Sequence, residues 1–206
     1  MYKKYPRTPH LPWSPGATND DKILKDTSHF DGQYIVVTEK RDGECITIYP
    51  DHIHARSLDS KDHYSRHYVK AIHASIKALI PEGWRICGEN LHYTKSLHYD
   101  NLIDFFEVFS IWNEENICLS WNETVKWCQL LGLQHVPIIW SGRWDEEFIR
   151  DLKLNEEKIE GYVVRNVDAF VYDMFHKNIA KYVRKGHVQT GDHWMHQQLI
   201  PNGLAR

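Results

Sequence analysis

Lys40 is the residue whose type and position most directly suggest chemistry. It stands in the run Glu39-Lys40-Arg41-Asp42-Gly43, between two apolar-rich segments at residues 34–38 and 45–49. An Asp-Gly dipeptide between two such segments is typical of a β-hairpin turn. We therefore expect Lys40 at the end of a strand, held by a hairpin, where its amine could act as a covalent nucleophile.

A surface lysine beside an ordinary hairpin turn is the simpler interpretation of this run. A Lys-x-Asp-Gly string arises by chance in roughly one chain of this size in twenty. What distinguishes this chain is an ordered series of further segments downstream. They are Ala55-Arg56-Ser57, Cys87-Gly88-Glu89-Asn90, Phe105-Phe106-Glu107-Val108-Phe109-Ser110, Glu160-Gly161-Tyr162-Val163-Val164-Arg165 and Ile179-Ala180-Lys181-Tyr182-Val183-Arg184-Lys185.

This order and spacing resemble the covalent nucleotidyltransferases, and among them the ATP-dependent RNA ligases most closely, over roughly residues 30–187. The resemblance implies an α+β, ATP-grasp-like nucleotidyltransferase domain of mainly antiparallel sheets with peripheral helices. It implies ATP and Mg²⁺ or Mn²⁺ as cofactors and a lysine that takes AMP from ATP. The AMP then passes to an RNA 5′-phosphate, which is sealed to a 3′-hydroxyl with release of AMP. The implied partners are these RNA ends, with an accessory protein or a template strand as a further expectation.

The resemblance also assigns roles to individual residues. Lys40 becomes the AMP acceptor and Glu160 the acid that organises the metal, although an exposed acid at a strand end is the ordinary alternative. A lysine with a pKa of about 10.4 is neutral in only about one molecule in two thousand at pH 7, so it needs burial or nearby cations. Lys181 and Lys185 would supply that positive charge and neutralise the α-phosphate. The implied nucleotide-binding residues are Glu39, Lys40, Asp42, Gly43, Arg56, Glu89, Phe109 and Lys181.

For three of these residues the resemblance also implies which part of the nucleotide or RNA each would contact. Glu89 would accept hydrogen bonds from ribose hydroxyls, and Arg56 would meet a phosphate or the accepting strand. Phe109 would stack on adenine, although an aromatic residue in a Phe-rich strand is by default a core residue.

Three positions depart from the family pattern. Cys45 stands where Asn, Ser or Arg is usual, Val183 replaces the second of two lysines two residues apart, and Ser110 stands where aspartate is frequent. Cys45 and Val183 keep open a non-catalytic module that binds nucleotides or RNA ends. A minimal DNA ligase or a GTP-using, capping-type enzyme would also fit the motifs, since both share the scaffold.

Length and composition fit one catalytic domain. A chain of 206 residues with 42% hydrophobic content can bury a proper core but leaves little room for a second full domain. We expect an extended N-terminal arm over residues 1–30 and a nucleotidyltransferase domain over 31–206, without a separate C-terminal OB domain. Apolar periodicity and capping signals predict helices over 60–80, 120–132, 145–154 and 192–199, and strands over 84–89, 105–112, 136–139, 161–165 and 179–183.

The N-terminal arm is punctuated by Pro6, Pro9, Pro12 and Pro15. Such an arm could simply wrap the core, or it could grip a single strand through Arg7, His10 and Trp13.

The formal charge of −3 argues against a uniformly basic nucleic-acid binder but leaves local positive fields open. Four widely spaced cysteines, no signal-peptide pattern and no membrane-length apolar run favour a reduced, cytoplasmic compartment with no membrane partner.

Overall fold

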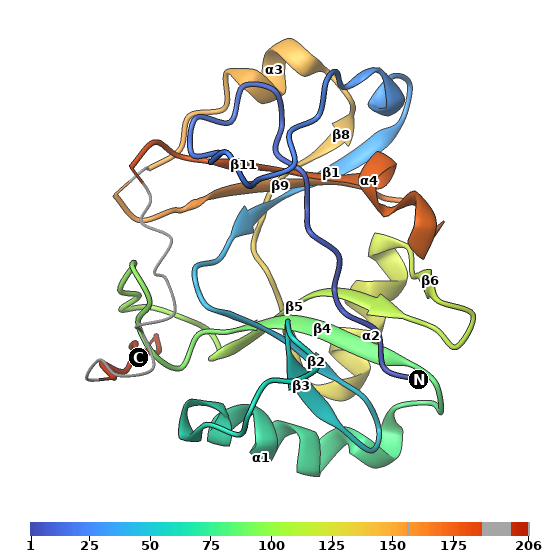
Figure 1. Cartoon of the computed structure of the whole chain (residues 1–206), viewed down its shortest axis with the longest axis vertical. Coiled ribbons are helices and arrows are strands. Elements are labelled where there is room, and N and C mark those ends of the chain that lie inside the picture. The colour runs from blue at the N-terminus through green and yellow to red at the C-terminus, as the bar shows by residue number, and fades with distance from the viewer. Residues whose placement is uncertain (156, 187–198, 206) are drawn as a thin grey trace.

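The computed structural model describes residues 1–155, 157–186 and 199–205, and its core is two β-sheets, one above the other in Figure 1. The upper sheet has four antiparallel strands in the order β11-β9-β1-β8. These strands are β1 (Tyr34–Lys40), β8 (Ile138–Arg143), β9 (Gly161–Asn166) and β11 (Ile179–Val183).

The lower sheet has seven strands in the order β10-β6-β5-β4-β2-β3, and the short β7 pairs with β5. Its strands are β2 (Glu44–Ile48), β3 (Ile53–Ala55), β4 (Arg85–Asn90), β5 (Phe106–Trp112), β6 (Ile117–Cys118), β7 (Gln134–His135) and β10 (Phe170–Val171). Among the strand pairs of this sheet in the described residues, only β5·β7 is parallel. The predicted α+β class, with mainly antiparallel sheets and peripheral helices, is confirmed.

The helices lie at the periphery of the two sheets. They are α1 (His67–Ile76), α2 (Trp121–Leu131), α3 (Glu146–Arg150) and α4 (Phe175–Asn178), with 3-10 turns at Ser28–Phe30, Tyr64–Arg66, Lys77–Leu79 and Tyr172–Met174. The helix expected over 60–80 is thus confined to its middle, and the one expected over 145–154 is a short helix. The helix expected over 192–199 lies almost entirely outside the described residues. None of the helices described is long and apolar enough to cross a membrane.

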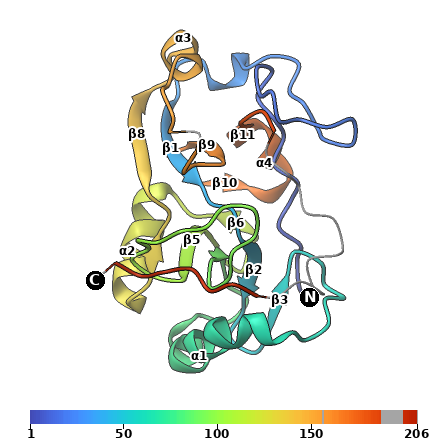
Figure 2. The same cartoon turned by 90° about the vertical axis from the view of Figure 1, so that its left-hand side faces the viewer.

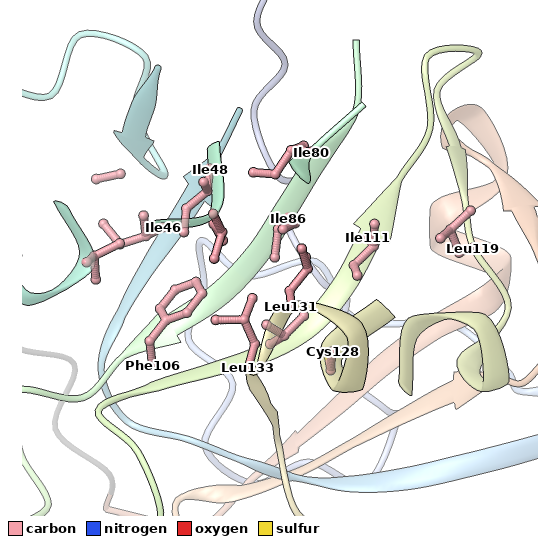
Figure 3. Packing of buried hydrophobic residues seen from close by; sticks show 14 residues of the cluster. Ile46, Ile48, Ile80, Ile86, Phe106, Ile111, Leu119, Cys128, Leu131 and Leu133 are labelled. Carbon is pink, nitrogen blue, oxygen red and sulfur yellow. The ribbon is translucent and has the colours of Figure 1, made fainter. Parts of the chain in front are cut away.

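The main hydrophobic core lies between the lower sheet and helices α1 and α2 (Figure 3). Ile46 and Ile48 of β2 and Ile86 of β4 reach it from the sheet, while Cys128 and Leu131 reach it from α2. Helix α2 starts with the capping box that the sequence predicts, because Ser120 and Glu123 bond each other's backbone N–H groups. This core fixes the lower sheet as a rigid platform.

A second core covers the outer face of the upper sheet. Ile35 and Val37 of β1 point into it, together with Tyr162 and Val164 of β9. The N-terminal arm contributes Leu11 and Phe30, and α3 contributes Ile149. In Figures 1 and 2 the arm climbs from the lower sheet, where the N-terminus lies, to the upper sheet. Leu11 and Phe30 of the arm are thus buried in this core.

The predicted hairpin around Asp42-Gly43 is wrong. β1 pairs with β8 and β9, whereas β2 pairs with β3 and β4, so the chain crosses from one sheet to the other at this turn. The glycine is needed for close packing, because a Cβ at Gly43 would lie 2.5 Å from the carbonyl oxygen of Asn90. Lys40 nevertheless ends a strand, as expected, and it does so where the two sheets are joined.

Candidate active site

The amine of Lys40 forms an ion pair with Glu160, the residue that precedes β9. The distance from Lys40 Nζ to Glu160 Oε2 is 2.7 Å, and the side chains are 24% and 6% exposed. The backbone carbonyl of Glu160 accepts a hydrogen bond from the N–H of Arg184, at 3.0 Å. At the next residue, a Cβ on Gly161 would lie 1.9 Å from the carbonyl oxygen of Tyr182, so only glycine lets β9 and β11 approach here.

Lys181 lies on the same face of the upper sheet as Lys40. Thr38 of β1, Val163 of β9 and Lys181 of β11 are paired directly across the three strands. Lys40 follows Thr38 by two residues, and side chains two apart on a strand share a face. The predicted nucleophile and one of the two predicted cations are therefore brought together.

Glu89 of β4 reaches the same place from the lower sheet. Its Oε1 accepts a hydrogen bond from the N–H of Gly43, at 3.2 Å. Burial raises the pKa of Glu89 to about 8, against an opposing effect of Lys40, and the nearby acids Glu160 and Asp42 raise it further. This carboxyl group therefore holds a proton far above the ordinary pH range of an acid.

The charges around Lys40 favour its protonated form. Burial alone would lower the pKa of Lys40, but Glu160 and Glu89 raise it, and the balance lies above the ordinary value. The expectation that neighbouring cations would make this amine neutral is thus not met. If Lys40 is the nucleophile, the charge of Glu160 must stabilise its ammonium form less before it can attack.

Lys181 experiences the opposite balance. Burial lowers its pKa, and the positive charges of Lys40 and Arg56 lower it further, while Asp21 and Glu160 oppose them. Arg56, just beyond β3, is exposed and close enough to act on Lys181. The site therefore combines three cationic side chains with three acids. They are Lys40, Lys181 and Arg56, and Asp21, Glu89 and Glu160. This combination suits a polyphosphate and a divalent cation.

Phe109 lies at a β-bulge of β5 and packs between the two sheets. Gly88 pairs with Val108 and Cys87 with Ser110, which leaves Phe109 as the extra residue. It shares a hydrophobic cluster with Val163 of the upper sheet and is touched by Tyr5 of the arm, with ring centroids 4.8 Å apart. Phe109 is only half-buried, so both a packing role and a stacking role fit its position.

The carboxylates of Glu39 and Asp42 form structural contacts. Glu39 follows Thr38, so its side chain points away from Lys40, and it accepts a hydrogen bond from Arg41 at 2.5 Å. Asp42 Oδ2 accepts hydrogen bonds from the N–H groups of Ser96 and Leu97, at 2.8 and 2.7 Å. Glu39 and Asp42 thus hold the Lys40 turn, and their predicted nucleotide contacts stay predictions.

The second predicted cation, Lys185, is not brought into the site by any contact described. It lies two residues beyond the end of β11 and is exposed. Val183, which replaces a family lysine, is 1% exposed and lies beside Gly161 in the sheet. Ser110, another departure from the pattern, is buried and accepts a hydrogen bond from Trp112 Nε1 at 3.0 Å.

The residues present fit a divalent cation that is shared with a substrate. Within the described part of the chain, no group of three or more His, Cys, Asp or Glu could hold a metal ion alone. Mg²⁺ commonly uses one or two carboxylates, several waters and substrate phosphates. Glu160 can supply one carboxylate, beside cations that would hold the phosphates.

Sequence reasoning missed the contribution of the N-terminal arm to this site. Asp21 of the arm has Oδ1 at 3.8 Å from Lys181 Nζ, and Tyr5 lies against Phe109. Proline spacing predicts an extended arm but says nothing of which strand it lies beside. An acid in a polar arm segment gives no signal that would separate it from a solvated one.

A family model described as RNA ligase matches residues 33–183, a span that contains Lys40, Glu89, Phe109, Glu160 and Lys181. No curated protein matches the chain.

Solved structures of Naegleria gruberi RNA ligase are similar in fold. A mutant with ATP and Mn gives a TM-score of 0.57 at 20% identity, covering 78% of this chain and 52% of that one. A mutant with AMP and Mn gives 0.58 at 19% identity, with the same coverage. The form with PPi gives 0.57 at 21% identity, again covering 78% and 52%. The present chain spans about half the length of these relatives.

Proposed function

Because the chain belongs to the RNA ligase family, we propose that it is an ATP-dependent RNA ligase that works through a lysyl-AMP intermediate at Lys40. The observation that carries the proposal is the position of the Lys40 amine. It ends β1, lies 2.7 Å from Glu160 Oε2, and shares a face with Lys181. The ATP, AMP, PPi and Mn in the Naegleria gruberi structures support ATP and a divalent cation as the cofactors.

In the first step, the neutral amine of Lys40 attacks the α-phosphorus of ATP. The new N–P bond forms as the bond to the β-phosphate oxygen breaks, and pyrophosphate leaves. Lys181 and Arg56 would neutralise charge on the phosphates as it moves during the displacement. Glu89 would accept hydrogen bonds from the ribose, and Phe109 would contact the base.

Glu160 would hold Mg²⁺ or Mn²⁺, which when bound would neutralise triphosphate charge and orient the leaving group. A carboxylate engaged in this way no longer stabilises the ammonium form of Lys40. Glu160 would then favour the ammonium form of Lys40 less, and the proton of Lys40, whose side chain is 24% exposed, would pass to water before the attack. This explains why a lysine with a raised pKa can still be the nucleophile.

Two further steps complete the reaction. A 5′-phosphate oxygen of RNA attacks the phosphorus of lysyl-AMP, so the N–P bond breaks and AMP becomes linked to the RNA end. A 3′-hydroxyl then attacks the 5′-phosphate, the phosphodiester forms, and AMP leaves. Besides the two RNA ends, a template strand or an accessory protein is part of the proposal.

Labelling with α-³²P-ATP and Mg²⁺ tests the first step. A ligase gives a labelled protein band that pyrophosphate reverses, and Lys40→Arg, which keeps the charge beside Glu160, abolishes the band. Absence of label in the wild type would leave a non-catalytic binder. Equal labelling by α-³²P-GTP would indicate a capping-type enzyme. Sealing of nicked duplex RNA, nicked DNA and single strands then separates an RNA ligase from a DNA ligase.

A further inference from the structure

The N-terminal arm forms the outer edge of the upper sheet beside Lys181. β11 is an edge strand of that sheet, and the N–H of Lys181 donates to the carbonyl of Pro9 at 2.9 Å. The carbonyl of Lys181 accepts from the N–H of Leu11 at 2.8 Å. Both backbone groups of Lys181 on this edge are therefore bonded to the arm, which fixes the point from which its side chain extends.

The arm also doubles back to place a carboxylate beside this lysine. The N–H of His10 donates to the carbonyl of Lys22 at 2.6 Å, and the N–H of Leu24 donates to the carbonyl of His10 at 2.8 Å. This backbone pairing brings Asp21 over β11, with its Oδ1 3.8 Å from Lys181 Nζ. Both side chains are only 17% exposed, so solvent screens the pair less than a pair on the open surface.

The Asp21 carboxylate is itself held in place. Its Oδ2 accepts hydrogen bonds from the N–H and the hydroxyl of Thr18, at 3.0 and 2.9 Å. The buried His10 ring lies on the same oxygen, with Nε2 at 3.4 Å, and its Nδ1 is 2.7 Å from Ser14 Oγ. Ser14 Oγ in turn accepts from the N–H of Val183, at 2.9 Å. One oxygen of Asp21 is thus anchored to the arm while the other faces the lysine.

We propose that Asp21 is a positioning residue for lysyl-AMP formation, which acts by holding the Lys181 ammonium in the candidate active site. The proposal rests on the function proposed above. Lys40 and Arg56 both repel Lys181, and a free lysine side chain could turn away from them. Asp21 offsets that repulsion from the side of Lys181 that faces the arm, so the cation stays where the phosphates would bind. The arm is then part of the catalytic centre as well as a cover for the core.

Asp21→Asn removes the charge with almost no change in shape, and Asp20→Asn is the matched control. Asp20 is the preceding residue and is exposed, and within the described residues its backbone carbonyl accepts a hydrogen bond from Arg7. We expect Asp21→Asn to slow lysyl-AMP formation roughly ten-fold and to change the KM for ATP by less than about two-fold. The reason is that displacing the Lys181 ammonium would weaken stabilisation of the transition state more than binding of ATP. Asp21→Glu should recover most of the rate, and Asp20→Asn should match the wild type.

A double-mutant cycle shows whether Asp21 acts through Lys181. In a Lys181→Ala background, Asp21→Asn should have no further effect, because the group that it positions is already absent. An equal rate for Asp21→Asn and wild type would overturn the proposal. So would a ten-fold loss that persists in the Lys181→Ala background, since that would mean a purely structural role. Equal melting temperatures of Asp21→Asn and Asp20→Asn confirm that the comparison is made between folded proteins.

A measurement that needs no activity separates this proposal from the proposed function. The rate at which an amine-reactive ester labels Lys181 is followed by peptide mass spectrometry in ligand-free protein. Loss of Asp21 should make Lys181 label several-fold faster, because its pKa falls further and its amine is freed. Unchanged labelling would refute the contact. If wild-type protein forms no lysyl-AMP but the labelling still responds, the ligase assignment fails and the Asp21 contact stands.

Discussion

Replacing Arg41 by methionine should destabilise the protein by about 3–5 kcal/mol, the usual cost of removing one partner from a buried ion pair. Arg41 donates from Nε and Nη2 to the two carboxylate oxygens of Glu107, at 2.7 and 3.0 Å, and from Nη1 to Glu39 at 2.5 Å. Its side chain is 12% exposed and that of Glu107 only 2%. Methionine fills a similar volume but leaves two acids close together without a cation.

The prediction can be checked by urea unfolding followed by tryptophan fluorescence. For a chain of this length, the expected loss corresponds to a fall in Tm of about 6–20 °C. Lys70→Met is the control, because Lys70 and Asp62 form an exposed ion pair, 40% and 69% exposed. Exposed pairs contribute about 0–1 kcal/mol. Equal stabilities of Arg41→Met and Lys70→Met would refute the reasoning that the Arg41 network holds the Lys40 turn.

The pH dependence of the Arg41→Met defect gives a second check. Burial raises the pKa of Glu107 even with Arg41 present, and loss of the arginine removes the main opposing effect. An acid whose folded-state pKa lies above its unfolded value loses stability as pH rises from the unfolded to the folded pKa. The defect should therefore be smaller at pH 5 than at pH 8. A defect that grows on acidification would contradict this account of the buried acids.

The remaining predictions concern three other positions. Glu89 has a folded-state pKa of about 8, above the pKa of the unfolded chain. Its contribution to stability therefore falls as pH rises from the unfolded pKa and levels off above about pH 8. Glu89→Gln should flatten this slope when the free energy of unfolding is measured from pH 5 to 9. Gly161→Ala should shift β9 against β11 and lower labelling by ATP at least about ten-fold, since a Cβ would lie 1.9 Å from the Tyr182 carbonyl oxygen; full activity would show that the strands can separate without harm. Ser120→Ala should cost about 1 kcal/mol in urea unfolding without changing labelling, because it removes only a helix cap.

Most strands and the position of Lys40 at the end of a strand were predictable because their signals are local. Apolar alternation marks the strands, and a glutamate before a glycine-led strand marks Glu160. The predicted nearness of Lys40, Glu89, Glu160 and Lys181 also holds, although these residues come from both sheets. The order of the motifs predicts that these residues share one site, whereas composition and periodicity do not.

The failures concern contacts between distant parts of the chain. An Asp-Gly dipeptide indicates a tight turn. Whether the two flanking strands pair with each other depends on the other strands with which they can pair. Here β2 pairs with β4 and not with β1, and Gly43 packs against the backbone of Asn90 in β4. Lys185 lies two residues beyond the end of β11, where the strand pairing does not fix its position, and its role stays a prediction. Asp21 gave no local signal, because its role depends on the edge strand over which the arm folds.

Intact-mass spectrometry after incubation with ATP and Mg²⁺, followed by mapping of the modified peptide, tests the central claim most directly. The account predicts a gain of one adenylate, located on Lys40, reversed by pyrophosphate and absent in Lys40→Arg. Wild-type protein that is folded yet never gains this mass, or that carries it on another residue, would contradict the claim that Lys40 is the nucleophile.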